Sequence, residues 1–391
     1  MGRIFIDVTQ SCRSSNSSGI QVVTRNIFRE INAIQETVPM IWDNRLRRYA
    51  QLSPTEKKNL LNPFPKGYKP KTRPNKQENP FYRELLCTLL RLRKRISLTE
   101  QPQDKDFILF PEVFRDNRVR HLPNIIHLDF KKAGIFYDAN VLRTPDETPP
   151  PRLKNFLGYL NFLSECHSIS CISEESLEAF ERHAAKTPRT RKIEVHHLPV
   201  DQPISTSKAR VQQTPLVLFV STLGYNKNHL NLMKAAEMLW AQGIRFELEF
   251  IGKADPSWTP KVLDALHLLS RKSRPIKWLR HVDQETLEKK YAECAFTVYP
   301  SLYEGFGMPI LESLIRGKPC ICGENGALGE VARGGGCLML KDQRQPEILA
   351  NSIKKLLSEP ALLSKLKIEA KNRSYSNWKE YSSKLLTFIS S

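Results

Sequence analysis

Short apolar segments alternate with amphipathic segments through the second half of the chain. From residue 215 onward, apolar runs such as LVLFV at 216–220 are typical of buried strands, and the segments between them have helical spacing of their apolar residues. Strands are expected at 216–220, 245–251, 276–279, 295–299 and 320–322, and helices at 228–243, 260–269, 284–292 and 309–316. This alternation predicts a doubly wound parallel sheet.

The first 200 residues show a similar but less regular pattern. Strands are expected at 3–8, 107–110, 124–128, 168–172 and 193–196, and helices at 19–34, 152–163 and 174–183. We therefore expect an α/β protein with two Rossmann-like doubly wound domains, at 1–199 and 215–372, facing each other across an inter-domain cleft, a common place for ligands. The Ser-, Gln- and Pro-rich stretch 200–214 is typical of a linker. A C-terminal helix within 373–391 is expected to cross back to the first domain.

Positive charge is concentrated in one segment of the first domain. The chain has 60 Lys and Arg against 41 Asp and Glu, a net charge of +19, and residues 45–96 hold 15 of the basic residues with only three acidic ones. Prolines fix φ and remove backbone donors, so the first part of this basic insertion is expected to be a surface excursion without a regular helix or a central strand. The charge suggests an anionic partner: nucleic acid, an acidic membrane surface or phosphorylated substrates.

The end of the insertion returns to helical periodicity at 81–96, with basic residues crowded at its C-terminal end. Such a basic amphipathic helix could lie on an anionic membrane surface, or could pack on its own domain with a solvated basic end. The pattern leaves both alternatives open.

The sequence patterns that are absent bear on the cellular compartment and on metal binding. It shows no apolar stretch of the length needed for a secretory signal or a membrane span, and its eight cysteines have no CxxC spacing. We therefore expect a cytoplasmic protein with reduced cysteines, which the basic helix could hold at the inner face of a membrane. No cluster with metal-ligand spacing is evident, so no metal is expected.

The densest candidate chemistry lies at 299–312, YPSLYEGFGMPILE. A buried strand ends there in a turn where Gly305 and Gly307 let backbone N–H groups approach a ligand closely. The helix that starts near Pro309 favours an anion such as a diphosphate at its N-terminus. The carboxylates of Glu304 and Glu312 suit the hydroxyls of a sugar and a ribose. The same pattern also fits a helix cap with two solvated acids.

This segment contains an E-x7-E motif, EGFGMPILE, and resembles the motif of retaining glycosyltransferases of family 4, which have the GT-B fold. The resemblance extends over nearly the whole chain except the basic insertion, and in the first half it is closest to mannosyltransferase-like members. The further matching segments are 220–229 (VSTLGYNKNH), 250–253 (FIGK), 287–300 (LEKKYAECAFTVYP), 330–331, 6–9, 18–23, 137–138, 145–146 and 172–176.

The resemblance implies a donor site in the second domain. Glu304 would contact the hydroxyls of the donor sugar, Glu312 the ribose hydroxyls, and Lys227 the diphosphate leaving group. Backbone amides of the glycine turn would hold sugar and phosphate. The implied donor-binding set is Gly19, Thr222, Lys227, Lys253, Glu304, Gly305, Phe306, Gly307 and Glu312.

On the acceptor side, Asp138 matches the aspartate of a cleft-facing loop in the family and is the candidate for orienting the reacting sugar or the acceptor. Ser173 and Glu174 are acceptor-side candidates, or only a helix N-cap and its first-turn acid. One departure concerns the donor site: where the family often pairs its lysine with an arginine, this chain has Thr222 and Asn226. Lys253 is a candidate substitute cation.

The implied function is transfer of a hexose, with mannose the first candidate, from a GDP- or UDP-linked donor to a glycan or lipid-linked acceptor of cell-surface polysaccharide or lipopolysaccharide. The reaction would retain the anomeric configuration and need neither metal nor cofactor beyond the donor. A catalytically degenerate sugar-nucleotide-binding subunit is a second hypothesis, suggested by Thr222 and Asn226. A nucleic-acid-binding protein that uses 45–96 is a third, but no RNA-binding motif is present and no nucleic acid is expected.

Overall fold

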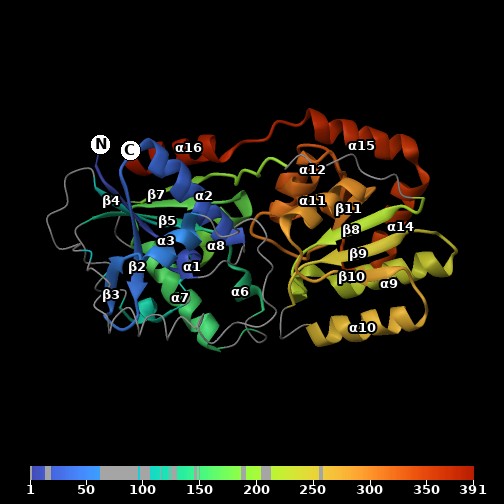
Figure 1. Ribbon diagram of the computed structural model, residues 1–391, viewed down its shortest axis with the longest axis horizontal. Helices are drawn as coiled ribbons and strands as arrows, with labels where there is room; N and C mark the ends of the chain where they lie inside the picture. The colour runs from blue at the N-terminus through green and yellow to red at the C-terminus, as the bar shows by residue number, and fades with distance from the viewer. Residues whose placement is uncertain are drawn as a thin grey trace. The chain divides into compact units, whose positions relative to one another are not determined.

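The chain divides into two compact units, Met1–Pro199 with Ser376–Ser391, and Val200–Tyr375 (Figure 1). The structure is a computed structural model. Both units are Rossmann-like α/β domains, which confirms the predicted fold class. The structure describes residues 2–13, 19–61, 96, 106–114, 116–121, 123, 125, 130–144, 148, 150–185, 191–203, 213–254 and 259–391.

A seven-stranded sheet of order β3-β2-β1-β4-β5-β6-β7 forms the centre of the first unit. Every neighbouring pair is parallel except β2 with β3, which is antiparallel at the sheet edge. The strand order reverses between β1 and β4, so the carboxyl ends of these strands flank the topological switch point. The strands are β1 (Ile4–Asp7), β2 (Thr37–Asp43), β3 (Arg48–Gln51), β4 (Phe107–Phe110), β5 (Lys131–Phe136), β6 (Ser168–Cys171) and β7 (Lys192–Val195).

Helices pack on this sheet, and one of them comes from the far end of the sequence. The C-terminal helix α16 (Trp378–Ser390) packs against α2 and β6 of the first unit (Figure 1). Its buried face includes Trp378, Tyr381 and Leu385, which accounts for its attachment. The other helices are α1 (Thr9–Arg13), α2 (Gly19–Ile34), α3 (Pro54–Leu61), the 3-10 helix η2 (Asn117–His121), α6 (Asn140–Arg143), α7 (Pro150–Ser164) and α8 (Glu174–His183).

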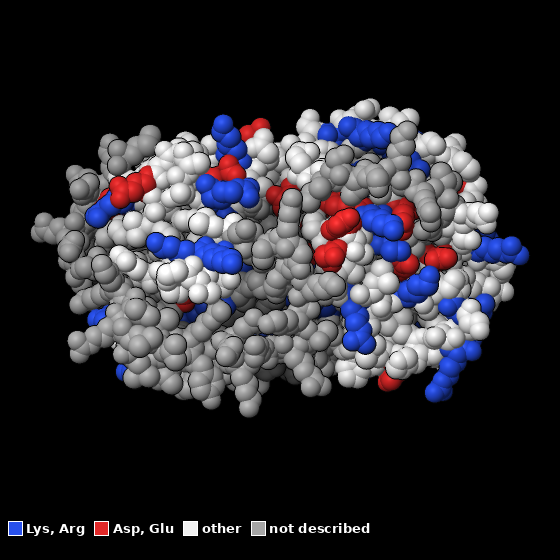
Figure 2. Space-filling model, in the orientation of Figure 1, with Lys and Arg blue, Asp and Glu red and all other residues white. Residues whose placement is uncertain are grey.

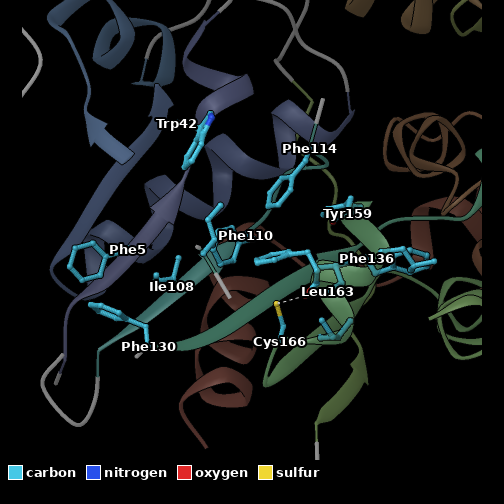
Figure 3. Packing of buried hydrophobic residues seen from close by; sticks show 14 of the residues in the cluster. Phe5, Trp42, Ile108, Phe110, Phe114, Phe130, Phe136, Tyr159, Leu163 and Cys166 are labelled. Carbon is cyan, nitrogen blue, oxygen red and sulfur yellow. Dashed lines mark hydrogen bonds between the residues drawn. The ribbon is translucent and has the colours of Figure 1, made fainter. Parts of the chain in front are cut away.

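Aromatic rings fill the core between the sheet and its helices (Figure 3). Phe110, at the end of β4, meets Phe162 of α7 at a centroid distance of 4.8 Å, and Phe114 meets Tyr159 at 5.2 Å. Edge-to-face contacts of this kind add about 0.5–1.5 kcal/mol each beyond burial of area. The core therefore holds the carboxyl end of β4 rigidly in place.

One expectation for the first unit needs correction, and one of its strands was not predicted. The segment from residue 45 was expected to lack a regular helix, but α3 occupies Pro54–Leu61, because a proline in the first turn gives up an N–H that has no helical partner. The neighbour of β4 in the sheet is β5 (Lys131–Phe136), which was not predicted because its two leading lysines obscured its apolar run, while the strand expected at 124–128 falls mostly outside the described residues. Residues 124 and 126–128 lie outside the described residues, as does the expected helix at 81–96 except Ile96.

The second unit is built on a six-stranded, wholly parallel sheet of order β10-β9-β8-β11-β12-β13. Here the order reverses between β8 and β11. The strands are β8 (Leu216–Val220), β9 (Glu247–Ile251), β10 (Ile276–Trp278), β11 (Phe296–Tyr299), β12 (Cys320–Gly323) and β13 (Cys337–Leu340). The helices are the 3-10 helix η4 (Tyr225–Lys227), α9 (His229–Ala241), α10 (Thr259–Arg271), α11 (Gln284–Glu293), α12 (Met308–Ile315), α13 (Gly326–Ala332), α14 (Pro346–Ser358) and α15 (Pro360–Asn372).

A glycine at the end of β9 fixes the path of the loop that follows β8. Gly252 has a φ of +154°, and an added Cβ would lie 1.8 Å from the carbonyl oxygen of Ser221. Only glycine permits so close an approach of the two backbones. The Trp278 indole donates a hydrogen bond of 3.0 Å to the Gly252 carbonyl and holds it there.

The described surface is mixed in charge. On the face drawn in Figure 2, lysines and arginines lie among acidic residues rather than in one continuous basic patch. No helix within the described ranges has the length and apolar character needed to cross a membrane.

Candidate active site

Two loops meet at the switch point of the second unit. The segment 221–228 follows β8 and the segment 300–307 follows β11, and these strands are neighbours in the sheet. The N–H of Leu302 donates to the carbonyl of Asn226 at 2.8 Å, which ties the loops together. In open α/β sheets, ligands bind outside the carboxyl ends of the strands at such a switch point.

The meeting of these loops pairs Lys227 with Glu304, 77 residues apart in sequence. The hydroxyl of Tyr299, the last residue of β11, donates to Glu304 at 2.9 Å and lies 3.2 Å from the Lys227 Nζ. The Lys227 and Glu304 side chains remain 17% and 12% exposed. The structure thus brings two of the predicted site residues together, within reach of solvent.

Tyr299 is a site residue that the sequence analysis missed. Its side chain is buried, and burial together with the Glu304 carboxylate raises the pKa of its phenol well above the usual value. The hydroxyl therefore keeps its proton and acts as a donor to the carboxylate. Its place at the carboxyl end of the central strand is the only sequence signal that could have indicated it.

Asn226 joins the two loops instead of supplying a charge. Its side-chain amide donates to the carbonyl of Tyr303 at 3.1 Å and to Glu304 at 3.5 Å. The next position but one, Asn228, has a left-handed φ of 64° and donates to the carbonyls of Pro300 and Gln343, at 3.1 and 2.6 Å. Asparagine tolerates this backbone conformation better than most residues. Both amides fix the loop that carries Lys227 against the glycine turn.

The glycine turn leads directly into α12. Gly305, Phe306 and Gly307 are buried, and Gly307 has a φ of 113° at the helix N-cap. An added Cβ at Gly307 would come within 3.2 Å of Leu328, so both strain and space favour glycine. Helix α12 therefore begins at the same edge of the sheet as Lys227 and Glu304. The dipole at its N-terminus favours an anion there.

Glu312 lies just over one turn into α12. The hydroxyl of Tyr291, on α11, donates to its carboxylate at 3.3 Å. Burial raises the pKa of Glu312, while the guanidinium of Arg316 opposes that rise. Arg316 itself is bound to Glu288 at 2.6 Å, so Glu312 is not neutralised by a direct ion pair of its own with Arg316.

His229, the first residue of α9, lies beneath the loop that carries Lys227. Its ring packs against Phe219 and Phe250 at centroid distances of 4.5 and 5.1 Å. Neither ring nitrogen has a hydrogen-bond partner among the described residues. Burial, with a smaller contribution from Lys227, lowers the His229 pKa to about 3, so the ring is neutral. It is part of the apolar support of the site.

The remaining donor-side candidates of the second unit flank the loop after β8. Thr222 is exposed, and its carbonyl accepts the N–H of Gly224 at 2.8 Å. Lys253 follows β9, is also exposed, and its carbonyl accepts the N–H of Leu223 at 2.9 Å. Their side chains face solvent near the carboxyl ends of β8 and β9.

Candidates in the first unit occupy helix starts. Gly19 begins α2, and no described atom lies within 4 Å of an added Cβ there, so the described residues of the unit do not require glycine. The Asp138 carboxylate accepts the N–H of Asn140 at 2.9 Å. Ser173 is the N-cap of α8 and forms a reciprocal capping box with Ser176, while Glu174 is exposed in the first turn. Ser173 therefore acts as a helix N-cap, one of the two alternatives considered for it.

Metal binding has no candidate site in this part of the protein. Over the described ranges, no group of three or more His, Cys, Asp or Glu side chains could hold a metal ion.

A cation, two acids and a helix N-terminus at a Rossmann-type switch point define a domain suited to a nucleotide-linked ligand. Residues 201–373 match the family described as Glycosyl transferases group 1. The matched residues span almost the whole of the second unit, Val200–Tyr375.

Curated relatives carry related names. The chain is 34% identical over 241 residues to an O-antigen chain mannosyltransferase B of Escherichia coli, a match that covers 56% of this chain and 60% of that protein. It is 25% identical over 227 residues to the serotype-specific mannosyltransferase WbdA of Escherichia coli, covering 52% of this chain and 28% of that protein. The chain thus spans less than two thirds of the length of either relative.

Solved structures share the fold of the whole chain. Sucrose-phosphate synthase from Thermosynechococcus elongatus superposes with a TM-score of 0.67 at 15% identity, covering 98% of this chain and 97% of that one. HepE from Anabaena, solved in complex with UDP and glucose, also has a TM-score of 0.67 at 15% identity, with full coverage of both chains. At this identity the likeness shows a common fold of the GT-B type.

Proposed function

We propose that the protein is a retaining glycosyltransferase of family 4 that moves a hexose from a nucleotide-diphosphate sugar to a glycan or lipid-linked acceptor. The observation that carries this proposal is the joining of Lys227 and Glu304 by two switch-point loops at the start of α12. The names of the E. coli relatives favour mannose as the sugar and a surface polysaccharide as the product. The donor would be GDP- or UDP-linked; HepE was solved with UDP.

Charge development explains the division of roles. Breaking the bond between sugar and diphosphate leaves negative charge on the phosphate and positive character on the sugar ring. Lys227 and the N-terminus of α12 would stabilise the phosphate, Glu304 would hold the sugar hydroxyls, and Glu312 the ribose hydroxyls. A donor bound here would place its phosphates at Lys227 and the start of α12, and its sugar at Glu304.

The remaining roles are carried by the first unit and the basic segment. Asp138 would orient the reacting sugar or acceptor, and Gly19 would approach the donor through its backbone. Ser173 and Glu174 would face the acceptor. Reaction without a metal would follow from Lys227 and the helix terminus serving as the counter-charge of the diphosphate. A cytoplasmic location, with residues 81–96 against the inner face of a membrane, fits a lipid-linked acceptor.

Ligand-dependent stability tests the proposal first. Purified protein would be heated with GDP, UDP, dTDP and their sugar conjugates, because a ligand at 100 times its dissociation constant adds about 2.7 kcal/mol to the free energy of unfolding. We expect stabilisation by one nucleotide family, strongest for GDP-mannose. If no nucleotide or nucleotide sugar raises the melting temperature, the proposed function is wrong.

Turnover separates an active enzyme from a degenerate binding subunit, the alternative raised by neutral Asn226. Release of nucleoside diphosphate in the presence of membrane-extracted acceptor would be measured for wild type, Glu304→Gln and Glu347→Gln. Glu347 is an exposed acid in the first turn of α14 and serves as the matched control. Activity lost only in Glu304→Gln supports transfer, while donor binding without turnover in wild type supports the degenerate subunit.

A further inference from the structure

Each acid of the E-x7-E motif is bound by the hydroxyl of a different buried tyrosine. Tyr299 donates to Glu304 at 2.9 Å, and Tyr291 donates to Glu312 at 3.3 Å. The tyrosines come from different elements, the end of β11 and the helix α11. Both tyrosines precede the motif in the sequence.

The two hydroxyls can act only as protonated donors to the acids. Tyr299 and Tyr291 are 4% and 1% exposed. Burial first, and then the neighbouring carboxylate, raises the pKa of each phenol well above its usual value. A hydrogen bond from a neutral donor to a carboxylate is stronger than one between neutral groups, and it fixes the direction in which the acid presents its free lone pairs.

Each tyrosine also contacts the cation nearest to its acid. Tyr299 accepts a hydrogen bond from the Lys227 Nζ at 3.2 Å, and the Arg316 guanidinium lies over the Tyr291 ring at 4.7 Å from its centroid. Arg316 is committed to Glu288 and to the backbone carbonyl of Glu312. Arg316 is thus engaged away from the Glu312 carboxylate, whereas Lys227 contacts both Tyr299 and Glu304.

We propose that Tyr299 and Tyr291 are positioning residues with separate tasks: Tyr299 keeps Glu304 directed at the donor sugar after Lys227 has moved to the diphosphate, and Tyr291 keeps Glu312 directed at the ribose. This inference rests on the proposed function. When Lys227 leaves Glu304, the carboxylate retains the Tyr299 hydroxyl and the more distant Asn226 amide. Without the hydroxyl, the acid would be free to follow the lysine.

Tyr299→Phe tests the first task. We expect kcat to fall about 10- to 100-fold, the range for a lost hydrogen bond to a charged group, with binding of GDP or UDP alone unchanged. Those nucleotides lack the sugar that Glu304 holds. The matched control is Tyr375→Phe, which removes a hydroxyl that donates to the Ala370 carbonyl at 2.8 Å in the same unit, away from both acids.

Tyr291→Phe tests the second task and should show the opposite split. We expect KM for the donor and Kd for GDP or UDP to rise about tenfold or more, with kcat little changed. The Tyr291 hydrogen bond lowers the Glu312 pKa, as Arg316 does, whereas burial, Asp201 and Glu288 raise it. Its loss should move the acid limb of the pH profile of kcat/KM to higher pH.

The outcomes separate failure of this inference from failure of the proposed function. A wild-type protein that binds no nucleotide sugar overturns the proposed function itself. An active wild type in which both phenylalanine variants behave like Tyr375→Phe overturns the positioning roles. Equal losses of kcat and nucleotide affinity in both variants, with no movement of the pH profile, also overturn them, because a general structural effect would not distinguish sugar from nucleotide.

Discussion

The switch points of the two sheets hold charged residues in opposite states. In the first unit, Asp7 at the end of β1 is bound by Arg118, from η2 after β4, and both side chains are 0% exposed. At the equivalent place in the second unit, Lys227 and Glu304 are 17% and 12% exposed. The same position in the fold is closed in one domain and open to solvent in the other.

The two acids of the closed cluster, Asp7 and Glu112, accept hydrogen bonds from neighbouring groups of the same unit. Asp7 accepts from the N–H of Thr9 at 3.1 Å and from the Tyr49 hydroxyl at 2.8 Å. Glu112 accepts the N–H groups of Gln10 and Ser11 at 2.6 and 2.7 Å, and burial followed by repulsion from Asp7 raises its pKa to about 7. Buried charges that pair with one another act as structure, whereas a pair that keeps some contact with solvent can exchange one partner for a ligand.

The largest expected effect tests the closed cluster. Arg118→Met should lower the free energy of unfolding by about 3–5 kcal/mol, because it leaves the buried Asp7 carboxylate without its cation. Urea denaturation would give the total change, and hydrogen exchange should show faster opening of peptides from β1 and β4 than from β8 and β11. A loss below about 1 kcal/mol would mean that the first unit's cluster is no more structural than the second unit's pair.

Lys227→Met should give the reverse pattern. Its removal should lower the free energy of unfolding by less than Arg118→Met does, because Glu304 keeps some exposure and the hydrogen bonds of Tyr299 and Asn226. Affinity for the nucleoside diphosphate should fall about 10- to 100-fold, as expected for a lost charge-assisted contact. Isothermal titration with GDP and UDP would measure it, with the exposed Lys234→Met, on α9, as control. Unchanged affinity would remove Lys227 from the site.

Local patterns predicted the parts of the fold that are apolar throughout. The strands β8 and β11 lie at the centre of their sheet, and strands covered on both faces are expected to be mainly apolar runs. The edge strand β3, the proline-containing β2 and the lysine-led β5 lack that signature and were not predicted. Helix α3 was missed because prolines were treated as breakers, although one of them starts it.

The site could be predicted in its residue types but not in its contacts. The E-x7-E motif and Lys227 stand out in the sequence, and the parallel order of the strands brings them together. The roles of Asn226 and Tyr299 depend on how a loop after one strand meets a loop after another. Such contacts between positions more than 70 residues apart leave no periodic trace in one sequence.

The buried ring of His229, beneath the second unit's switch point, should give a smaller effect, on the pH dependence of the free energy of unfolding. Its pKa of about 3 lies below the ordinary 6.5, so the unfolded state binds the proton more readily and stability falls as pH drops below about 6.5. Between pH 7 and 5, wild type should lose about 2 kcal/mol relative to His229→Leu. Urea denaturation of both proteins at the two pH values measures the difference. Parallel pH dependences would place the ring in contact with water.

The smallest expected effect concerns Glu312, where binding and stability should oppose each other. Burial raises its folded-state pKa above 4.5, so the folded protein holds the proton more tightly than the unfolded chain does. Stability associated with this group is therefore lost as pH rises from about 4.5 through the raised pKa. Glu312→Gln should be more stable than wild type at pH 8, and the gain should shrink toward pH 4.

The same variant should bind GDP or UDP more weakly, because an amide accepts ribose hydroxyls less strongly than a carboxylate does. Thermal unfolding across pH, with and without nucleotide, measures both quantities on one sample. Glu324→Gln, an exposed acid after β12, is the control that should change neither. A variant that is less stable at pH 8 yet binds normally would make Glu312 a structural acid like Asp7, and would remove the contrast between the two switch points.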